Sequence, residues 1–398
     1  MDTHILDIIK NLSVEYAQDI IDIRHHLHQY PELSFQEKNT TSYIKQQLEK
    51  EGIQYTDRYL DTGVVAWIHG KSKEFISLRA DIDALPITEN TQVPYASKNE
   101  GIMHACGHDV HTSCALGAMK ILKRLESSLP FSVVCYFQPG EEKLPGGALQ
   151  LIEAGALDDF PSKYIIGQHV SPELPVGSIG IKPGIFMASA DEIYITIKGK
   201  GGHAAAPHKN NDVVLTASQC IVQLQTLVSR YANPITPTVL SFGKVNTDGG
   251  ATNVLPSKIS LEGTFRTFDE KWRNEAHQHI QDIVHNVASS YHCEAKVDIL
   301  KGYPCLHNDE QLTNDIKRHF SQYLGNDMII DLDARMTAED FAYYSQKMPA
   351  CFYRLGTGGT NPSTQHNVHS PYFDIDEDAL QIGAGLLAWS AFLNLKMV

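Results

Sequence analysis

Short apolar runs that alternate with helical patterns constrain the fold of this 398-residue chain more than any other feature. Four runs have the length and composition of buried strands: 64–68, 75–78, 132–137 and 164–166. Between them, the spacing of apolar residues predicts helices over 107–126 and 146–154. Strands that alternate with helices favour an α/β fold with a largely parallel sheet.

The pattern changes near residue 187, and the chain is longer than one hydrophobic core usually allows. Residues 191–199 (DEIYITIKG) alternate between apolar and polar side chains, which is typical of a half-exposed strand. The segments that follow predict a helix, two strands, a second helix and a last strand: 211–231, 238–246, 257–267, 269–291 and 293–300. This βαββαβ order is that of a ferredoxin-like domain. We therefore expect an inserted domain at 187–299, and a second domain formed by 1–186 and 300–398.

Charge and composition exclude several classes of function. The formal net charge of −14 argues against nucleic acid or a membrane surface as a partner. No apolar stretch reaches the roughly 18 to 20 residues that a membrane span needs. The seven cysteines are odd in number and scattered, which favours reduced thiols. Because the opening residues also lack the features of a signal peptide, we expect a cytoplasmic protein.

The segment MHACGHDVH contains the densest group of potential metal ligands. Its candidates are His104, Cys106, His108, Asp109 and His111. Thiolate, imidazole and carboxylate groups bind zinc, manganese, cobalt or nickel. The glycine between Cys106 and His108 would allow both side chains to face one ion. The sequence therefore predicts a metal site here rather than a loop with ordinary surface histidines.

Carboxylates follow two of the predicted strands. Asp81 and Asp83 end one strand, and alternation directs them to the same side of the sheet. Asp83 is the better candidate for a group that orients a ligand histidine, although both acids could simply be solvated. Glu141 and Glu142 follow another buried strand. One of them could bind metal while the other takes a proton from water.

Two more histidines complete a possible ligand set. His169 follows an apolar strand, and His369 lies near the C-terminus. Either one alone would more often be structural. Together with Cys106, His108 and Glu142 they would supply a shell for two ions. Since these residues are spread from 106 to 369, they do not have the short paired spacings of a zinc-stabilised structural module.

The predicted inserted domain carries three further candidates. His203, in GKGGHAAAPH, has no metal ligand close to it in the sequence and could donate a hydrogen bond to an oxyanion. Asn253 and Arg266 are candidates for binding substrate. An arginine fork suits a substrate carboxylate, but a surface ion pair would explain Arg266 equally well.

Eight sequence blocks follow one another along the chain: RHHLHQYPELSFQE, LRADIDALPI, MHACGHDVHTS, FQPGEE, GQHV, GKGGHAAAPH, MTAEDFAYY and HSPYFDIDE. In these blocks the chain resembles the metallo-aminoacylase and carboxypeptidase family of dinuclear amidohydrolases, peptidase family M20. It is most similar to the branch of N-acyl-amino-acid, hippurate and auxin-conjugate hydrolases, which the cysteine of HACGH marks. It departs from that pattern at Arg24-His25, where an arginine pair is usual.

The resemblance implies a metallopeptidase-like catalytic domain, with the inserted domain as lid and dimerisation domain. It implies two divalent ions per subunit (Zn, Mn, Co or Ni), held by Cys106, His108, Glu142, His169 and His369. Glu141 would be the general base, and His203 would stabilise the oxyanion in the neighbouring subunit of a homodimer. The implied reaction is hydrolysis of the amide bond of a small N-acyl amino acid. A dipeptidase or carboxypeptidase with the same centre is the alternative, whereas retention of both glutamates disfavours a non-catalytic binding protein.

Overall fold

The computed structural model describes residues 3–393 and divides the chain into two compact units. Unit 1 contains Met1–Phe186, His307–Asp333 and Asp340–Val398, and unit 2 contains Met187–Leu306 and Ala334–Glu339. The sequence patterns do not separate the short segment Ala334–Glu339 from the residues around it. Among the helices within residues 3–393, none combines the length and the apolar character that crossing a bilayer requires.

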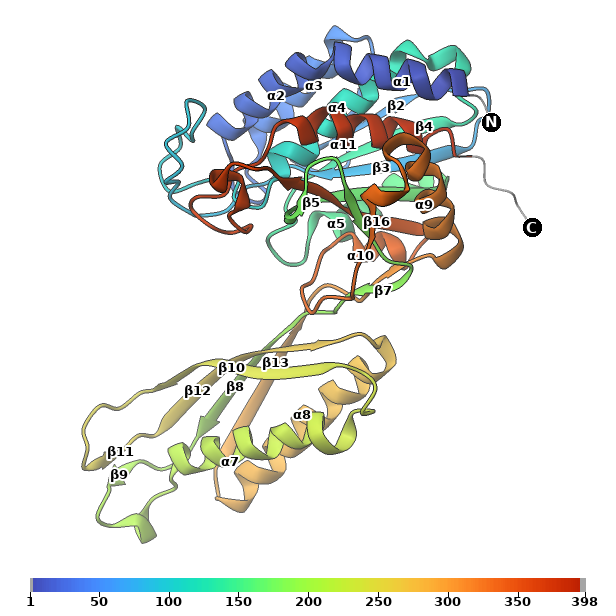
Figure 1. The fold of residues 1–398 in the computed structure, drawn as a ribbon. Coiled ribbons are helices and arrows are strands. Elements are labelled where there is room, and N and C mark those ends of the chain that lie inside the picture. Colours follow the sequence, from blue (N-terminus) through green and yellow to red (C-terminus); the bar gives the residue numbers. More distant parts are fainter. Residues whose placement is uncertain (1–2, 394–398) are drawn as a thin grey trace. The chain divides into compact units, whose positions relative to one another are not determined.

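An eight-stranded sheet forms the centre of unit 1, in the order β1-β2-β4-β3-β5-β16-β6-β15 (Figure 1). Its strands are β1 (Gln54–Thr56), β2 (Val64–Ile68), β3 (Phe75–Asp81), β4 (Ser132–Gln138), β5 (Ser162–Pro175), β6 (Ile179–Ile181), β15 (Ile329–Asp331) and β16 (Ala350–Gly358). Neighbours are parallel from β4 to β16, but β1, β2 and β4 pair antiparallel, and so do β16 and β6. At the far edge, β15 runs parallel to β6. The sheet is therefore mixed, whereas the sequence predicts a largely parallel one.

Helices cover both faces of this sheet, which is why β3 and β4 are buried at every position. On one face lie α4 (His108–Arg124) and α11 (Asp378–Ser390), and on the other lie α5 (Gly147–Glu153) and α10 (Ala342–Ser345). A side chain at Gly117 of α4 would collide with Ile20 and Ala384, so glycine allows close helix packing there. The other α-helices of unit 1 are α1 (Thr3–Glu15), α2 (Ala17–Gln29), α3 (Lys38–Lys50), α6 (Ala156–Asp159) and α9 (Glu310–Leu324).

Unit 2 is built on a four-stranded antiparallel sheet in the order β10-β12-β8-β13. Along the chain its main elements are β8 (Asp191–Lys198), α7 (Val213–Thr226), β10 (Thr238–Thr247), β12 (Lys258–Thr267), α8 (Glu270–Ser290) and β13 (Glu294–Lys301). Isoleucines at alternate positions of β8 are buried against α7 and α8. Asp212 and Asp269 cap the two helices by accepting main-chain N–H bonds. A small ribbon of β9 (Gly202–His203) and β11 (Val254–Leu255) extends from the main sheet.

Candidate metal centre

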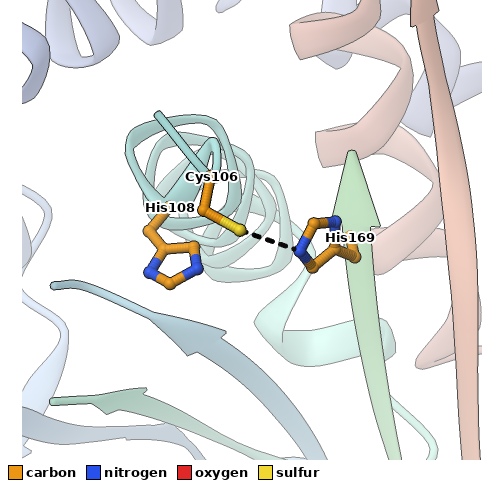
Figure 2. A group of neighbouring side chains, drawn as sticks. All are labelled: Cys106, His108 and His169. Atoms are coloured by element: carbon orange, nitrogen blue, oxygen red, sulfur yellow. Dashed lines mark hydrogen bonds between the residues drawn. The ribbon is translucent and has the colours of Figure 1, made fainter. Parts of the chain in front are cut away.

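Cys106 and His108 flank the turn through which the chain enters α4. Gly107 has a φ of 80° there, and an added Cβ would lie 2.6 Å from Val170. His108 is the first residue of the helix. Figure 2 shows the sulfur of Cys106 directed at His169, which comes from β5; its Sγ lies 3.4 Å from His169 Nε2.

A second set of ligand atoms meets at the same sulfur. His369 Nε2 lies 3.3 Å from Cys106 Sγ and 3.3 Å from Glu142 Oε1. One group thus consists of Cys106, His108 and His169, and another of Cys106, Glu142 and His369; within each group the ligand atoms lie within 4.8 Å of one another. Because the two groups share one sulfur, Cys106 could bridge two cations.

Buried ligand atoms that lack hydrogen-bond partners show that these residues fit a cation. Within the part of the chain that the structure describes, His108 Nε2 and Glu142 Oε1 are such atoms. A coordinated cation would supply the partner that the hydrogen bonds of the site do not. His108 Nδ1 binds Asp83 Oδ1 (3.1 Å), and His169 Nδ1 donates to the carbonyl of Val170 (2.8 Å). Both imidazoles therefore present Nε2 to the centre.

The surrounding charges hold protons on two of these ligands. Burial opposes the charge of His108, but the carboxylates of Asp81 and Asp83 raise its pKa to about 10. Burial and the carboxylate of Glu142 raise the pKa of the Cys106 thiol well above its ordinary value. A cation must displace these protons, so the affinity for metal should increase with pH.

Asp83 connects the ligands to the main chain that carries both glutamates. Its Oδ1 accepts hydrogen bonds from His108 Nδ1 (3.1 Å) and from the main-chain N–H of Glu141 (3.1 Å). Its Oδ2 accepts from Ser34 Oγ (2.6 Å) and from the N–H of Glu142 (3.0 Å). A single buried carboxylate thereby sets the orientation of an imidazole and of the loop after β4.

We expect the substitution Asp83→Asn to lower the affinity for metal by about 10- to 100-fold, because an amide cannot accept all four of these hydrogen bonds. Competition with a chromogenic chelator would measure the affinity. Asp61→Asn, at an exposed position, is the matched control and should bind metal normally. An unchanged affinity in the Asp83 variant would show that the network does not support the ligands.

Glu141 lies beside the two groups. Together with His108 and Glu142 it forms another group of possible ligands, whose ligand atoms lie within 4.8 Å of one another. It is only 6% exposed, and its Oε1 accepts the main-chain N–H of Asp340 at 3.4 Å. A carboxylate in this place can exchange a proton with a molecule bound at the centre.

The other candidates of the MHACGHDVH segment have different surroundings. Asp109 Oδ2 accepts from Arg24 Nε (3.2 Å), in a buried ion pair. His111 binds Asp81 through Nδ1 (2.6 Å), and its Nε2 accepts a main-chain N–H (2.9 Å). Both nitrogens of His104 are buried without a partner among residues 3–393, yet His104 belongs to none of the close ligand groups. His111 forms a separate close group with Asp81 and His108, so of the five candidates Cys106 and His108 belong to the two groups that share the sulfur.

The three candidates of unit 2 do not form one site within that unit. His203 is exposed in β9. The main-chain N–H of Ala204, the residue after His203, donates to the carbonyl of Asn253 (2.9 Å). Arg266 lies eight residues beyond the start of β12, about 25 Å along the strand from this ribbon. Its guanidinium is half-buried and donates to the carbonyl of Met336 (3.0 Å). One copy of unit 2 thus presents His203 and Arg266 at opposite ends of β12.

His203 has a defined tautomer. Its Nδ1 accepts the main-chain N–H of Ala205 (3.0 Å), so the proton of the neutral imidazole is on Nε2. The other ring nitrogen of this exposed residue, Nε2, is therefore a hydrogen-bond donor.

Several buried polar residues behind the centre are not predicted by the sequence patterns. Ser34 binds Asp83, and Glu37 accepts the N–H of Gly140 (2.9 Å), directly before the two glutamates. Asp340 faces Glu141 through its N–H. The only signal for these residues was their place in RHHLHQYPELSFQE and MTAEDFAYY, two blocks that contain no predicted ligand.

Glu37 should make the stability of the metal-free protein depend on pH. Burial, together with the negative charge of Asp83, raises its pKa from 4.5 to about 7. The folded chain then holds this proton more tightly than the unfolded chain. The free energy of unfolding should therefore fall, by on the order of 2–3 kcal/mol, as the pH rises from about 4.5 to about 7.

Urea unfolding of the metal-free protein on either side of this pH window would measure the effect. Glu37→Gln cannot ionise, so its unfolding free energy should depend less on pH than that of the parent protein. Equal pH dependence of the two proteins would mean that Glu37 titrates normally.

Known proteins resemble this chain in sequence and in fold. The family model for peptidase family M20/M25/M40 matches residues 77–391. An N-acetyl-L-cysteine deacetylase of Bacillus subtilis is 45% identical over 93% of this chain and 86% of its own length. A second protein of that organism, N-acetylcysteine deacetylase, is 39% identical over 95% of this chain and 97% of its own length.

Two solved structures are similar over almost the whole chain. A putative aminohydrolase from methicillin-resistant Staphylococcus aureus aligns with a TM-score of 0.91 at 30% identity, covering 98% of this chain and 100% of its own. The YXEP protein of Bacillus subtilis, described as a dinuclear metal binding peptidase from the M20 family, has a TM-score of 0.81 and 37% identity. That alignment covers 95% of this chain and 98% of the other.

Proposed function

This chain belongs to the peptidase family M20/M25/M40. We propose that the centre at which its two ligand groups share Cys106 hydrolyses the amide bond of small N-acyl amino acids. It is a metal-dependent hydrolase of linear amides, like the deacetylases related to it. The observation that carries the proposal is the meeting of two ligand groups at Cys106, with the carboxylate of Glu141 next to them. Such a centre combines a cation site with an adjacent proton acceptor.

Two divalent cations would occupy the centre. Cys106, His108 and His169 would hold one, and Cys106, Glu142 and His369 the other. When bound, two cations supply Lewis acidity and lower the pKa of a water molecule at the site. The thiolate and imidazole ligands favour zinc, while manganese, cobalt and nickel are also compatible with this donor set.

The reaction then depends on residues with distinct tasks. Glu141 would accept the proton of the attacking water and transfer it to the nitrogen of the departing amine. His203 would donate its Nε2 proton to the developing oxyanion. Asn253, next to His203 on the ribbon, would support that end of the substrate site, and Arg266 would bind the carboxylate of the amino acid.

A homodimer would bring these groups together. His203 and Arg266 lie at opposite ends of β12, so one unit 2 cannot place both on one small substrate. A second copy could supply His203 to its neighbour's centre. Apolar residues exposed on α7, namely Val214, Leu215 and Val222, and the unpaired outer edge of β10 offer a surface for this contact.

Unit 2 would accordingly be a ferredoxin-like lid and dimerisation domain, inserted at about 187–299 into the catalytic domain. Its support is the order of helices and strands and the strand order β10-β12-β8-β13. We further propose that the protein works in the cytoplasm, because all seven cysteines are free thiols.

A substrate panel with metal-reconstituted protein tests the proposed reaction. N-acetylcysteine is the first candidate, because two relatives are named as its deacetylases. Other acetyl, benzoyl and indoleacetyl amino acids and a set of dipeptides complete the panel. We expect kcat/KM to be highest for an N-acyl amino acid in at least one metal form. A higher kcat/KM for dipeptides would instead establish the peptidase alternative.

A further inference from the structure

Asp340 is anchored where the chain returns from unit 2 to unit 1. Its Oδ1 accepts from Arg79 Nη2 (2.6 Å), and its Oδ2 accepts from Gln138 Nε2 (2.7 Å) and from the N–H of Ala148 (3.0 Å). The side chains of Asp340 and Arg79 are fully buried. The position of this carboxylate is thus determined by donors from three different segments of unit 1.

The anchors of Asp340 also support one another. Arg79 Nη1 binds Asp81 Oδ2 (2.6 Å), and Arg79 Nε donates to Gln138 Oε1 (2.9 Å). The hydroxyl of Tyr344 donates to the same oxygen of Gln138 (3.2 Å). The network therefore links the ends of β3 and β4 to the segment that precedes α10.

The main-chain N–H of Asp340 is directed at Glu141, whose Oε1 accepts it at 3.4 Å. Because the side chain of Asp340 is held at both oxygens, its N–H has little freedom to move. Stability alone is a weak explanation for this arrangement, since a buried ion pair is often no more stabilising than apolar side chains of similar volume. An orienting role explains why the network ends at Glu141, the carboxylate that would accept the proton.

We propose that Asp340 is a positioning residue, which uses its own N–H, anchored through Arg79 and Gln138, to hold the carboxylate of Glu141 for proton transfer. This inference rests on the proposed function, in which Glu141 is the general base. It concerns the geometry of the base and leaves the metal ligands untouched.

The substitution Asp340→Asn tests the proposal. An amide keeps the shape of the side chain, but it lacks the charge that pairs with Arg79 and cannot accept hydrogen bonds at both positions. We expect kcat to fall by about 10- to 100-fold, because a small displacement of a reacting group has this effect. KM, the metal content and the visible spectrum of the cobalt form should stay as in the parent protein. Asp309→Asn, at the cap of α9, is the control and should retain its kcat.

Combination with Glu141→Asp shows whether Asp340 acts through Glu141. The shorter carboxylate no longer reaches the N–H of Asp340, so Asp340→Asn should change kcat by less than about twofold in that background. If Asp340→Asn does not fold, Asp340→Glu replaces it, because it retains the charge for Arg79 but displaces the main chain.

The results separate two kinds of failure. If Glu141→Gln is inactive but Asp340→Asn retains the parent kcat, the positioning role is wrong and the proposed function stands. Equal losses from Asp340→Asn in the parent protein and in the Glu141→Asp variant would also overturn the positioning role. If Glu141→Gln remains active, Glu141 is not the general base, and the proposed function itself is wrong in that respect.

Discussion

Replacement of Glu141 by glutamine should lower kcat by about 10²- to 10⁴-fold, which is the usual contribution of a general acid–base group. Glutamine has nearly the same shape but cannot take a proton from water. Glu141 belongs to neither of the two groups that share Cys106, so the variant should bind both metals. Steady-state kinetics on the best substrate, together with metal analysis of the same sample, measure both expectations.

Glu153→Gln is the matched control for this experiment, because Glu153 is an exposed acid at the end of α5. It should retain full activity. A Glu141→Gln protein that kept a tenth of the parent rate would remove Glu141 from the role of base. A variant that lost a metal would show instead that Glu141 acts as a ligand.

The substitution His203→Ala should raise the barrier by about 2.7–4 kcal/mol, which corresponds to a loss of about 10²- to 10³-fold in kcat, as for other oxyanion donors. His203 is exposed and packs into no core, so the variant should fold normally. His208→Ala changes another exposed histidine of the same segment and should be almost fully active. Near-normal kinetics of the His203 variant would refute the oxyanion role.

Mixing two inactive variants tests whether His203 acts in the neighbouring subunit. A heterodimer of His203→Ala and Glu141→Gln chains would contain one centre with both an intact Glu141 and an intact His203. Random exchange should restore up to about a quarter of the parent activity. If His203 serves its own subunit, the mixed dimer has no complete centre and the mixture stays inactive.

Local patterns were sufficient to predict most elements of unit 2 and part of unit 1. The alternation over 191–199 and the helical spacing over 269–291 correspond to β8 and α8 within one or two residues. The resemblance to family M20 is confirmed by the family model. The edges of the large sheet were less predictable: whether β2 runs antiparallel to β4 depends on the path of the connecting chain, which side-chain periodicity does not record.

The sequence by itself determined which chemical groups are available: the thiol of Cys106, several imidazoles and a pair of glutamates. These groups lie in motifs that are typical of the family. Only the tertiary structure decided which of them meet. Cys106 and His369 are separated by 263 positions, yet their ligand atoms lie 3.3 Å apart. Asp109 and His111 instead bind Arg24 and Asp81. The same holds for Ser34, Glu37 and Asp340, whose contacts with the centre come from distant segments. Hydrogen bonds between such segments form only when the chain is folded, so no spacing along the sequence could reveal them.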